Sequence, residues 1–411
     1  MSTVRKIALV TLVILVWSAF VAYGFIDGFL LRSISSNCTP AAFVKAVEEQ
    51  IKDESVGNFA MILIENGEIA ETHYHTIDQT VDQNTLFPVA SISKWVTSFG
   101  VMQLVEKGKL DLDKPIDDYL SRWQLPESEF DNRKVTTRRL LSHSAGLTDG
   151  LGYEGFGPDE TVQTLEESLT KAADAAYSDG VARVGLEPGS QYRYSGAGYT
   201  ILQLLIEELT GKSFQTYMQE EVLIPLGMEH SAFGLPDNPN VQLAQVFRTD
   251  GTTRQSNQFT ALAAAALFTC TEDLYKFLLA NMTENPVLSR ESLVTITTAE
   301  SFINTIGVYG LGPHLYSQND KESKIIGHDG SGNNAINTAA RADLVSESGI
   351  IILETGHYTM ASSLADEWMF WKAGIADYVV MQRNIPYVLS WLGIGSLLIT
   401  IVSIYYFRRQ V

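Results

Sequence analysis

The chain lacks several features that define other protein classes. It has only 2 cysteines among 411 residues, too few for a small fold held together by disulfides. Basic side chains are scarce, with 29 Lys and Arg against 48 Asp and Glu, a formal net charge of −19. Because a surface of this sign repels phosphate backbones, we expect no nucleic-acid partner. The sequence contains neither a Gly-x-Ser-x-Gly nucleophile elbow nor a P-loop.

Internal repeats and low-complexity tracts are also missing, and 45% of the residues are hydrophobic. This composition is typical of a folded protein with a substantial core, and it excludes disordered and collagen-like classes. The length is sufficient for two or three domains, and one enzyme-sized body fits it well.

Charge is absent from two long stretches, of which the first covers residues 7–26. These 20 residues follow Arg5 and Lys6 and, at about 1.5 Å per residue, can cross a hydrocarbon core of roughly 30 Å. A cleaved signal peptide has the same order of features. Its apolar region is usually only about 7–15 residues long, however, and only residues 22–24 resemble a cleavage site. We therefore favour a retained membrane anchor, while cleavage near Gly24 stays open.

The second uncharged stretch covers residues 386–407 and is 22 residues long. Aromatic residues near its ends and its length favour a membrane-spanning helix over the alternative, a buried core helix. Arg408 and Arg409 follow it at once. Since the basic clusters lie on the outer ends of the two stretches, the positive-inside rule predicts that both termini are cytoplasmic. Residues 33–382 would then lie on the other side of the membrane.

Residues 366–380 contain four aromatic residues among charged ones and fit either a helix along the membrane interface or a packing helix of the body. Cys38 and Cys270 would lie in an oxidising compartment under this topology, where a disulfide is permitted. The sequence does not establish that they are close enough to bond.

The order of secondary structure predicts an α+β fold. Residues 41–53 have helical spacing, and two strand-like runs at residues 59–64 and 69–75 flank Asn66-Gly67, a pair that accepts a tight type I′ turn. Strands at both ends of the body with helices between them favour one sheet built from both chain ends and a helical insertion. The expected helices include residues 91–107, 136–142, 198–209 and 213–223, and the late strands are residues 309–317, 324–327, 336–340 and 349–354.

A candidate nucleophile lies at the start of the helix over residues 91–107. Ser91 and Lys94 are three residues apart, so their side chains share one face of the helix. A serine hydroxyl becomes a nucleophile when a neighbour takes its proton, and a lysine whose pKa is lowered by burial can do this. The same Ser-x-x-Lys spacing occurs at Ser168 and Lys171, where a solvated helix face is the better interpretation.

Two further segments give Ser91 its context. Residues 192–199 read Tyr-Arg-Tyr-Ser-Gly-Ala-Gly-Tyr before an apolar helix, and residues 327–332 read Gly-His-Asp-Gly-Ser-Gly between late strands. With Ser-x-x-Lys, they resemble in order and spacing the three motifs of the class C β-lactamase and low-molecular-weight penicillin-binding protein family. Three supporting stretches are similar to the same family, and the resemblance covers residues 41–357; the stretches are residues 140–147, 225–228 and 264–277.

This resemblance implies an antiparallel sheet flanked by helices, with a helical subdomain over about residues 91–298. It also implies roles for single residues. Ser91 would attack a carbonyl and become acylated, Lys94 would accept its proton, and Tyr194 would relay a proton to the leaving group. His328 would shape the electrostatics around Tyr194.

On the substrate side, the resemblance implies that Gly330 lets a strand approach the substrate. The backbone N–H groups of Ser91 and Ser331 would form the oxyanion hole, where such donors are typically worth about 3 kcal/mol each. Gly196 stands where the family usually has the Asn of Tyr-x-Asn. Loss of that amide weakens the expectation of β-lactam or peptide binding, so ester or amide substrates of another shape become more plausible.

Several other residues have plainer interpretations. His73 and His75 share a strand face, as some metal sites require, but no third ligand is near in sequence, so we expect exposed strand residues and no metal. We expect His143 to support a helix end. Residues 150–189 fit a lid or an exposed linker, and the linker is the safer interpretation.

The sequence therefore predicts a membrane-anchored serine hydrolase that forms an acyl-enzyme on an ester, amide or D-amino-acid peptide, without metal or organic cofactor. Its partners would be this small substrate and membrane lipid, at the outer face of a bacterial inner membrane. The alternative is a non-catalytic sensor or scaffold that binds cell-wall fragments in the same cleft. The oligomeric state and the substrate itself are not determined.

Overall fold

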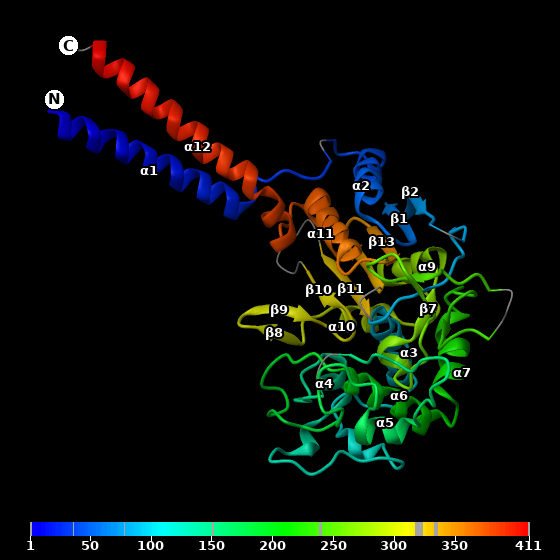
Figure 1. Cartoon of the computed structure of the whole chain (residues 1–411). Helices are drawn as coiled ribbons and strands as arrows, with labels where there is room; N and C mark the ends of the chain where they lie inside the picture. The colour runs from blue at the N-terminus through cyan, green and yellow to red at the C-terminus, as the bar shows by residue number, and fades with distance from the viewer. Residues whose placement is uncertain are drawn as a thin grey trace. The chain divides into compact units, whose positions relative to one another are not determined.

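The computed structural model describes residues 2–35, 37–77, 79–149, 152–237, 241–316, 324–332 and 336–409. The chain divides into two compact units (Figure 1). One unit comprises residues 48–365 and contains the sheet and the helical insertion. The other comprises residues 1–47 and 366–411 and contains the two long terminal helices.

An eight-stranded antiparallel sheet forms the frame of the larger unit. The first two strands come from the start of the body and the rest from its end, so the prediction of one sheet built from both chain ends is confirmed. The spatial order is β2-β1-β13-β12-β11-β10-β9-β8. The strands are β1 Phe59–Glu65, β2 Glu68–His75, β8 Ser301–Ile303, β9 Ile306–Tyr309, β10 His314–Leu315, β11 Ile325–Gly332, β12 Ile336–Asp343 and β13 Ser348–Thr355.

The predicted hairpin is present between β1 and β2. Asn66 and Gly67 connect the strands with φ values of 51° and 78°, which are the positive angles that a type I′ turn requires. Strand β13 is buried at every position, so the centre of the sheet is covered on both faces. The residues of edge strand β2 are exposed or half-buried, and none is fully buried.

Helices and short strands make up the insertion between β2 and β8. Helix α3, Ile92–Glu106, is buried along nearly its whole length, and α6, Gly196–Thr210, lies close to it. Helix α9, Thr271–Met282, contacts β1, β12 and β13 and thus covers one face of the sheet. The remaining elements are the 3-10 turns Ile116–Asp118 and Asn132–Lys134, α4 Thr137–Leu141, α5 Leu165–Lys171, α7 Phe214–Met218, a π-helical turn Gln219–Leu223, α8 Leu262–Ala265, α10 Arg290–Ile296, β3 Phe87–Pro88, β4 Ala232–Phe233, β5 Val246–Phe247, β6 Thr253–Arg254 and β7 Leu267–Thr269.

Two predicted strands differ in the structure. The predicted run over residues 309–317 is not one strand, because residues 310–313 interrupt it; Gly312 has a φ of 127° and Pro313 has no N–H to donate. Ser317 lies outside the described residues. The motif over residues 327–332 lies inside β11, not between strands, and pairs with β12 along its length. Its glycines permit close backbone approach, since a Cβ on Gly327 would lie 2.2 Å from the Ala340 oxygen.

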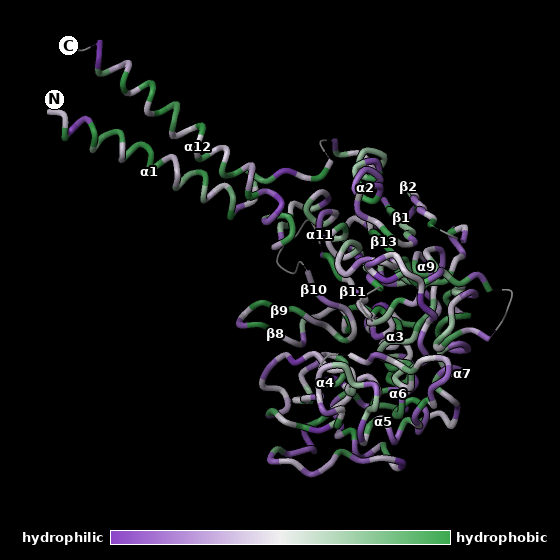
Figure 2. Tube along the Cα trace, viewed as in Figure 1, coloured by the Kyte–Doolittle hydropathy of each residue, from purple (hydrophilic) through white to green (hydrophobic). Residues whose placement is uncertain are grey.

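The smaller unit contains α1, Thr3–Asp27, and α12, Tyr378–Arg409, which run side by side in opposite directions (Figure 1). The Trp17 indole donates a hydrogen bond to the Trp391 oxygen at 3.2 Å and packs where a side chain on Gly395 would be. Both helices are predominantly hydrophobic (Figure 2). Each is long and apolar enough to cross a membrane, with mean hydropathy of 2.3 and 2.0.

Helix α2, Pro40–Glu54, matches its predicted range, and α11 spans Met360–Ala373. Residues 366–380 therefore do not form one interfacial helix. They contain the end of α11, where Trp368 is fully buried, a break at residues 374–377, and the start of α12.

Candidate active site

Ser91 and Lys94 lie together at the start of α3. The Lys94 Nζ is 3.0 Å from the Ser91 Oγ and donates a second hydrogen bond to the Ala264 oxygen at 2.7 Å. Ala90, just before the serine, has a positive φ of 45°, an unfavourable angle for a residue with a Cβ. The Ser93 hydroxyl stabilises this turn by donating to the Ala90 oxygen. The local backbone thus holds the serine in the first turn of the helix.

The amine of Lys94 is almost completely buried, with a relative exposure of 1%. Burial lowers its pKa to about 7, although the negative charge of Asp149 acts in the opposite direction. A large fraction of the amines is therefore neutral near pH 7, and a neutral amine can accept the proton of a neighbouring hydroxyl.

Tyr194 lies beside this pair, in the segment before α6. Its ring centroid is 4.9 Å from the Lys94 Nζ. Burial raises the pKa of the Tyr194 phenol, while a hydrogen bond with the Ser91 side chain lowers it to a smaller extent. The phenol therefore keeps its proton near neutral pH, which suits a proton donor or relay and not a base.

His143 holds the tyrosine segment in place. Its Nδ1 accepts a hydrogen bond from the Ser195 N–H at 3.1 Å, and its carbonyl oxygen accepts one from the Arg193 N–H at 2.7 Å. Its ring centroid is 4.2 Å from that of Tyr194. The expectation that His143 supports a helix end was therefore incomplete, because the side chain positions the residues on both sides of Tyr194.

His328 lies on β11 and is buried. Its Nδ1 is 2.6 Å from the main-chain carbonyl oxygen of Asp329. Because a carbonyl oxygen can only accept a hydrogen bond, Nδ1 carries the hydrogen. The other ring nitrogen, Nε2, then accepts a hydrogen bond from the Tyr309 hydroxyl at 3.0 Å. Burial, followed by the charge of nearby groups, places its pKa well below the ordinary value. A neutral imidazole thus lies with its centroid 6.2 Å from that of Tyr194.

Gly330 and Ser331 follow on the same strand. A Cβ on Gly330 would lie 2.1 Å from the Val89 oxygen, so only glycine lets β11 approach the chain that leads into α3. Ser331 is exposed and lines the same cavity as Ser91. The role of the two backbone N–H groups as an oxyanion hole stays a prediction.

A cavity of about 640 Å³ opens over these residues. Residues 152–154 and 176–177 of the segment 150–189 line part of it, and Tyr177 is also exposed, so the lid and the exposed linker both stay predictions for this segment; Gly150 and Leu151 lie outside the described residues. Its lining comprises Ser91, Gly152, Tyr153, Glu154, Ala176, Tyr177, Tyr194, Arg248, Thr249, Asp250, Arg254, His314, His328, Asp329, Ser331, Gly332 and Tyr358.

Three residues around Ser91 and Tyr194 have no local signal in the sequence. The Asp149 carboxylate accepts hydrogen bonds from the Ser195 hydroxyl and from the Ala197 N–H, at the start of α6. His314 on β10 stacks on Tyr194 at a centroid distance of 6.4 Å, and burial lowers its pKa to about 4. Tyr153 lies against Gly196. All three come from segments remote in sequence, so no spacing rule could have found them.

The sequence predicted no metal site at His73 and His75. In the structure the His73 Nδ1 lies 3.1 Å from a carboxylate oxygen of Glu48. Among the described residues, one group has a donor set that could hold an ion: His230, Cys270 and Asp273. One oxygen of Asp273 already accepts from the His230 N–H and from both the N–H and the hydroxyl of Ser231. Burial raises the pKa of the Cys270 thiol to about 12. These contacts fit a structural carboxylate better than a metal ligand. Cys38 and Cys270 are both free thiols.

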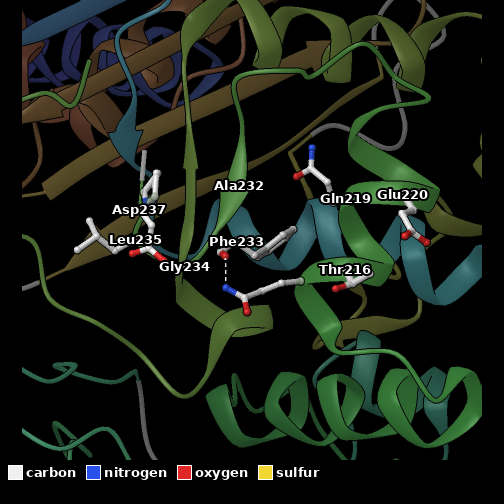
Figure 3. Close-up of a pocket in the computed structure, with 10 residues that line it drawn as sticks. Thr216, Gln219, Glu220, Ala232, Phe233, Gly234, Leu235 and Asp237 are labelled. Carbon is white, nitrogen blue, oxygen red and sulfur yellow. Dashed lines mark hydrogen bonds between the residues drawn. The ribbon is translucent and has the colours of Figure 1, made fainter. Parts of the chain in front are cut away.

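A second cavity, of about 400 Å³, lies between α7 and β4 (Figure 3). Gln215 on α7 donates a hydrogen bond to the Phe233 oxygen at 2.8 Å, drawn there as a dashed line. The cavity lining contains no nucleophile next to a base, so the larger cavity over Ser91 is the candidate site.

Comparison with known proteins agrees with this geometry. The family model described as Beta-lactamase matches residues 43–369, which is most of the chain. The chain belongs to the Beta-lactamase family. A curated member of similar sequence is penicillin-binding protein 4* of Bacillus subtilis (strain 168), 29% identical over 188 residues. That match covers 44% of this chain and 39% of the relative, so the relative is much longer than the shared part.

Solved structures with the β-lactamase-family fold extend the similarity. The octameric penicillin-binding protein homologue from Pyrococcus abyssi has a TM-score of 0.68 at 23% identity, covering 84% of this chain and 79% of that one. EstCE1, a hydrolase with promiscuous acyltransferase activity, has a TM-score of 0.64 at 17% identity, covering 80% and 97%. At these identities the similarity concerns the fold, which is the α+β fold that the sequence predicts.

Proposed function

We propose that this member of the Beta-lactamase family is a membrane-anchored serine hydrolase that forms an acyl-enzyme at Ser91. The observation that carries the proposal is the buried Lys94 amine, 3.0 Å from the Ser91 Oγ and with a pKa lowered to about 7. A weakly basic amine in contact with a hydroxyl at a cavity floor is the arrangement that nucleophilic catalysis requires. The names of the relatives, a penicillin-binding protein and a hydrolase, support the same class.

In the proposed reaction, the Ser91 Oγ attacks the substrate carbonyl carbon and its proton passes to Lys94. The oxyanion would lie near the backbone N–H groups of Ser91 and Ser331. Tyr194 would give its proton to the leaving alcohol or amine and recover one from Lys94, so no net proton is lost. Water would then attack the acyl-enzyme by the reverse route, releasing the acid and restoring the serine.

The substrate class we propose is small esters, amides or D-amino-acid peptides. The imidazole of His328 is neutral and so adds no positive charge of its own beside the Tyr194 phenol, which favours proton donation over formation of a phenolate.

Membrane anchoring is the second part of the proposal. The long apolar helices α1 and α12 expose most of their large hydrophobic side chains, more apolar surface than water-soluble proteins usually leave uncovered. With basic residues at both outer ends, we propose cytoplasmic termini and a catalytic body on the outer side of a bacterial inner membrane.

Labelling of the full chain in detergent tests the catalytic proposal. A fluorophosphonate probe or a fluorescent penicillin should label the wild type, and Ser91→Ala should abolish the label. Ser168→Ala is a matched control, because Ser168 begins the second Ser-x-x-Lys sequence and its buried hydroxyl has no hydrogen-bond partner. Reversible muropeptide binding without any labelling or ester turnover would instead support the non-catalytic sensor, which is motivated by Gly196 in place of the family Asn and by the two apolar segments.

A further inference from the structure

Gly196 stands at the start of α6, and its backbone does not explain why it is a glycine. Its φ is not among the positive values that favour glycine. The reason is space: a Cβ on Gly196 would lie 2.7 Å from the Tyr153 Cε2, closer than real Cβ contacts. The Tyr153 ring thus occupies the volume that any side chain at position 196 would need.

The Tyr153 ring is firmly held in this position. Its hydroxyl forms a hydrogen bond with the Thr200 Oγ1 at 3.1 Å, on the first turns of α6. The next two residues attach the backbone to Asp174, since Glu154 N–H donates to its carbonyl oxygen at 2.8 Å and Gly155 N–H to its carboxylate at 3.1 Å. These hydrogen bonds fix the position of the ring in the wall of the cavity.

The same ring lines the cavity over Ser91, as Tyr194 does. Many other side chains of the lining are charged, including Glu154, Arg248 and Asp329. The Tyr153 hydroxyl already bonds to Thr200, so the part of this side chain that is left for a bound molecule is the ring, which is hydrocarbon. An amide placed against this face would lose its hydrogen bonds to water without replacement, whereas an alkyl or aryl group would gain from burial.

We infer that Tyr153 and Gly196 form a complementary pair that sets acyl-group specificity, so that the enzyme prefers substrates whose acyl group is a hydrocarbon over those whose acyl group carries an amide. This inference rests on the proposed hydrolase function and adds the substrate class to it. Tyr153 is a specificity-determining residue in this view, and Gly196 is the space that it requires.

A kinetic experiment on the full chain in detergent tests the pair. The probes are the p-nitrophenyl esters of valeric acid and of N-acetylglycine, which share the leaving group and differ in the acyl chain. The ratio of their kcat/KM values in each variant, divided by the wild-type ratio, cancels their intrinsic reactivities. Tyr153→Ala should lower the ratio of valerate to N-acetylglycine ester about tenfold. Tyr153→Phe keeps the ring and should keep the ratio.

A stability cycle provides a readout that does not need turnover. Gly196→Ala should lower the unfolding midpoint of the wild type by about 3 °C or more, because the new methyl meets the Tyr153 ring. In a Tyr153→Ala background the same change should have no such effect or raise the midpoint, since alanine favours a helix. Independent, additive effects of the two changes would contradict the pairing.

The outcomes separate the two proposals. If the wild type hydrolyses both esters but Tyr153→Ala leaves their ratio unchanged, the specificity inference fails and the hydrolase proposal stands. If the wild type neither hydrolyses an ester nor takes an acylating label, both fail.

Discussion

At the scale of single residues, the proposed chemistry depends on the environment of one lysine. Lys94 donates hydrogen bonds to Ser91 and to the Ala264 oxygen and has almost no contact with solvent. Lys171, three residues after Ser168, has the same spacing but is exposed; the expected solvated helix face is confirmed for Lys171 and wrong for Ser168, whose side chain is buried. Burial therefore distinguishes Lys94, the candidate base, from Lys171.

The pH dependence of acylation should report the lysine. Because the pKa of Lys94 is about 7, we expect kcat/KM for p-nitrophenyl acetate to rise about tenfold per unit at pH values below 7 and to level off above it. Rates would be corrected with Ser91→Ala, which retains only background hydrolysis. A flat profile from about pH 5.5 to 8.5 would exclude this lysine as the proton acceptor.

The same burial should destabilise the fold. Between about pH 7 and the ordinary lysine pKa of 10.5, the unfolded chain binds more protons than the folded chain, so the free energy of unfolding rises with pH in this window. Lys94→Met removes this dependence and should stabilise the protein at pH 7 by roughly 1–2 kcal/mol, with a smaller difference at higher pH. Denaturant unfolding at two pH values measures it, with exposed Lys109→Met as control. Equal pH dependence in Lys94→Met and wild type would refute the argument.

At the scale of elements, the site depends on how closely β11 approaches the start of α3. The Thr338 hydroxyl donates to the Val89 oxygen at 3.2 Å across this contact, and Gly330 lies between them with no room for a Cβ. The strand pattern in the sequence placed residues 327–332 between two late strands. The structure shows a continuous strand, since glycine also occurs where two backbones meet.

Two alanine substitutions on β11 should therefore behave differently. Gly330→Ala forces a methyl to 2.1 Å from the Val89 oxygen, and we expect it to lower the free energy of unfolding by about 2 kcal/mol or more and to reduce labelling of Ser91. Gly332→Ala is the control, because its Cβ would meet its nearest neighbour at 3.8 Å, an ordinary contact. Similar losses in both variants would mean that the close approach is unimportant.

At the scale of the whole molecule, a folded body with the family fold is joined to two long apolar helices. Inside the smaller unit these helices pair through Trp17, which packs onto Gly395. Such close packing against a small residue is common between helices in membranes, where burial of apolar surface does not drive association.

The proposed topology can be tested with the natural cysteines. Cys38 is an exposed free thiol in the segment after α1, whereas Cys270 is buried. In intact spheroplasts, a membrane-impermeant maleimide should label the full chain at Cys38, and Cys38→Ser should remove the label. Labelling that appears only after the membrane is broken would place this segment in the cytoplasm and reverse the proposed orientation.

Much of the fold and part of the site were predictable because the signals are local. The hairpin at Asn66-Gly67 follows from turn geometry, and helices α2, α3 and α6 from hydrophobic spacing. The interruption of the strand predicted over residues 309–317 was not predictable from the sequence. The apolar residues of this run are typical of a strand, and they do not reveal that Gly312 adopts a positive φ that breaks it.

The sequence alone determined that Ser91 and Lys94 share one face of a helix and that two stretches are long and apolar, since both features depend only on residues that are close together along the chain. Only the tertiary structure decided that Tyr194 and His328 lie around that serine and that Tyr153 fills the space beside Gly196. It also decided the pKa of Lys94, because a proton's affinity for an amine depends on the water that the surrounding chain excludes.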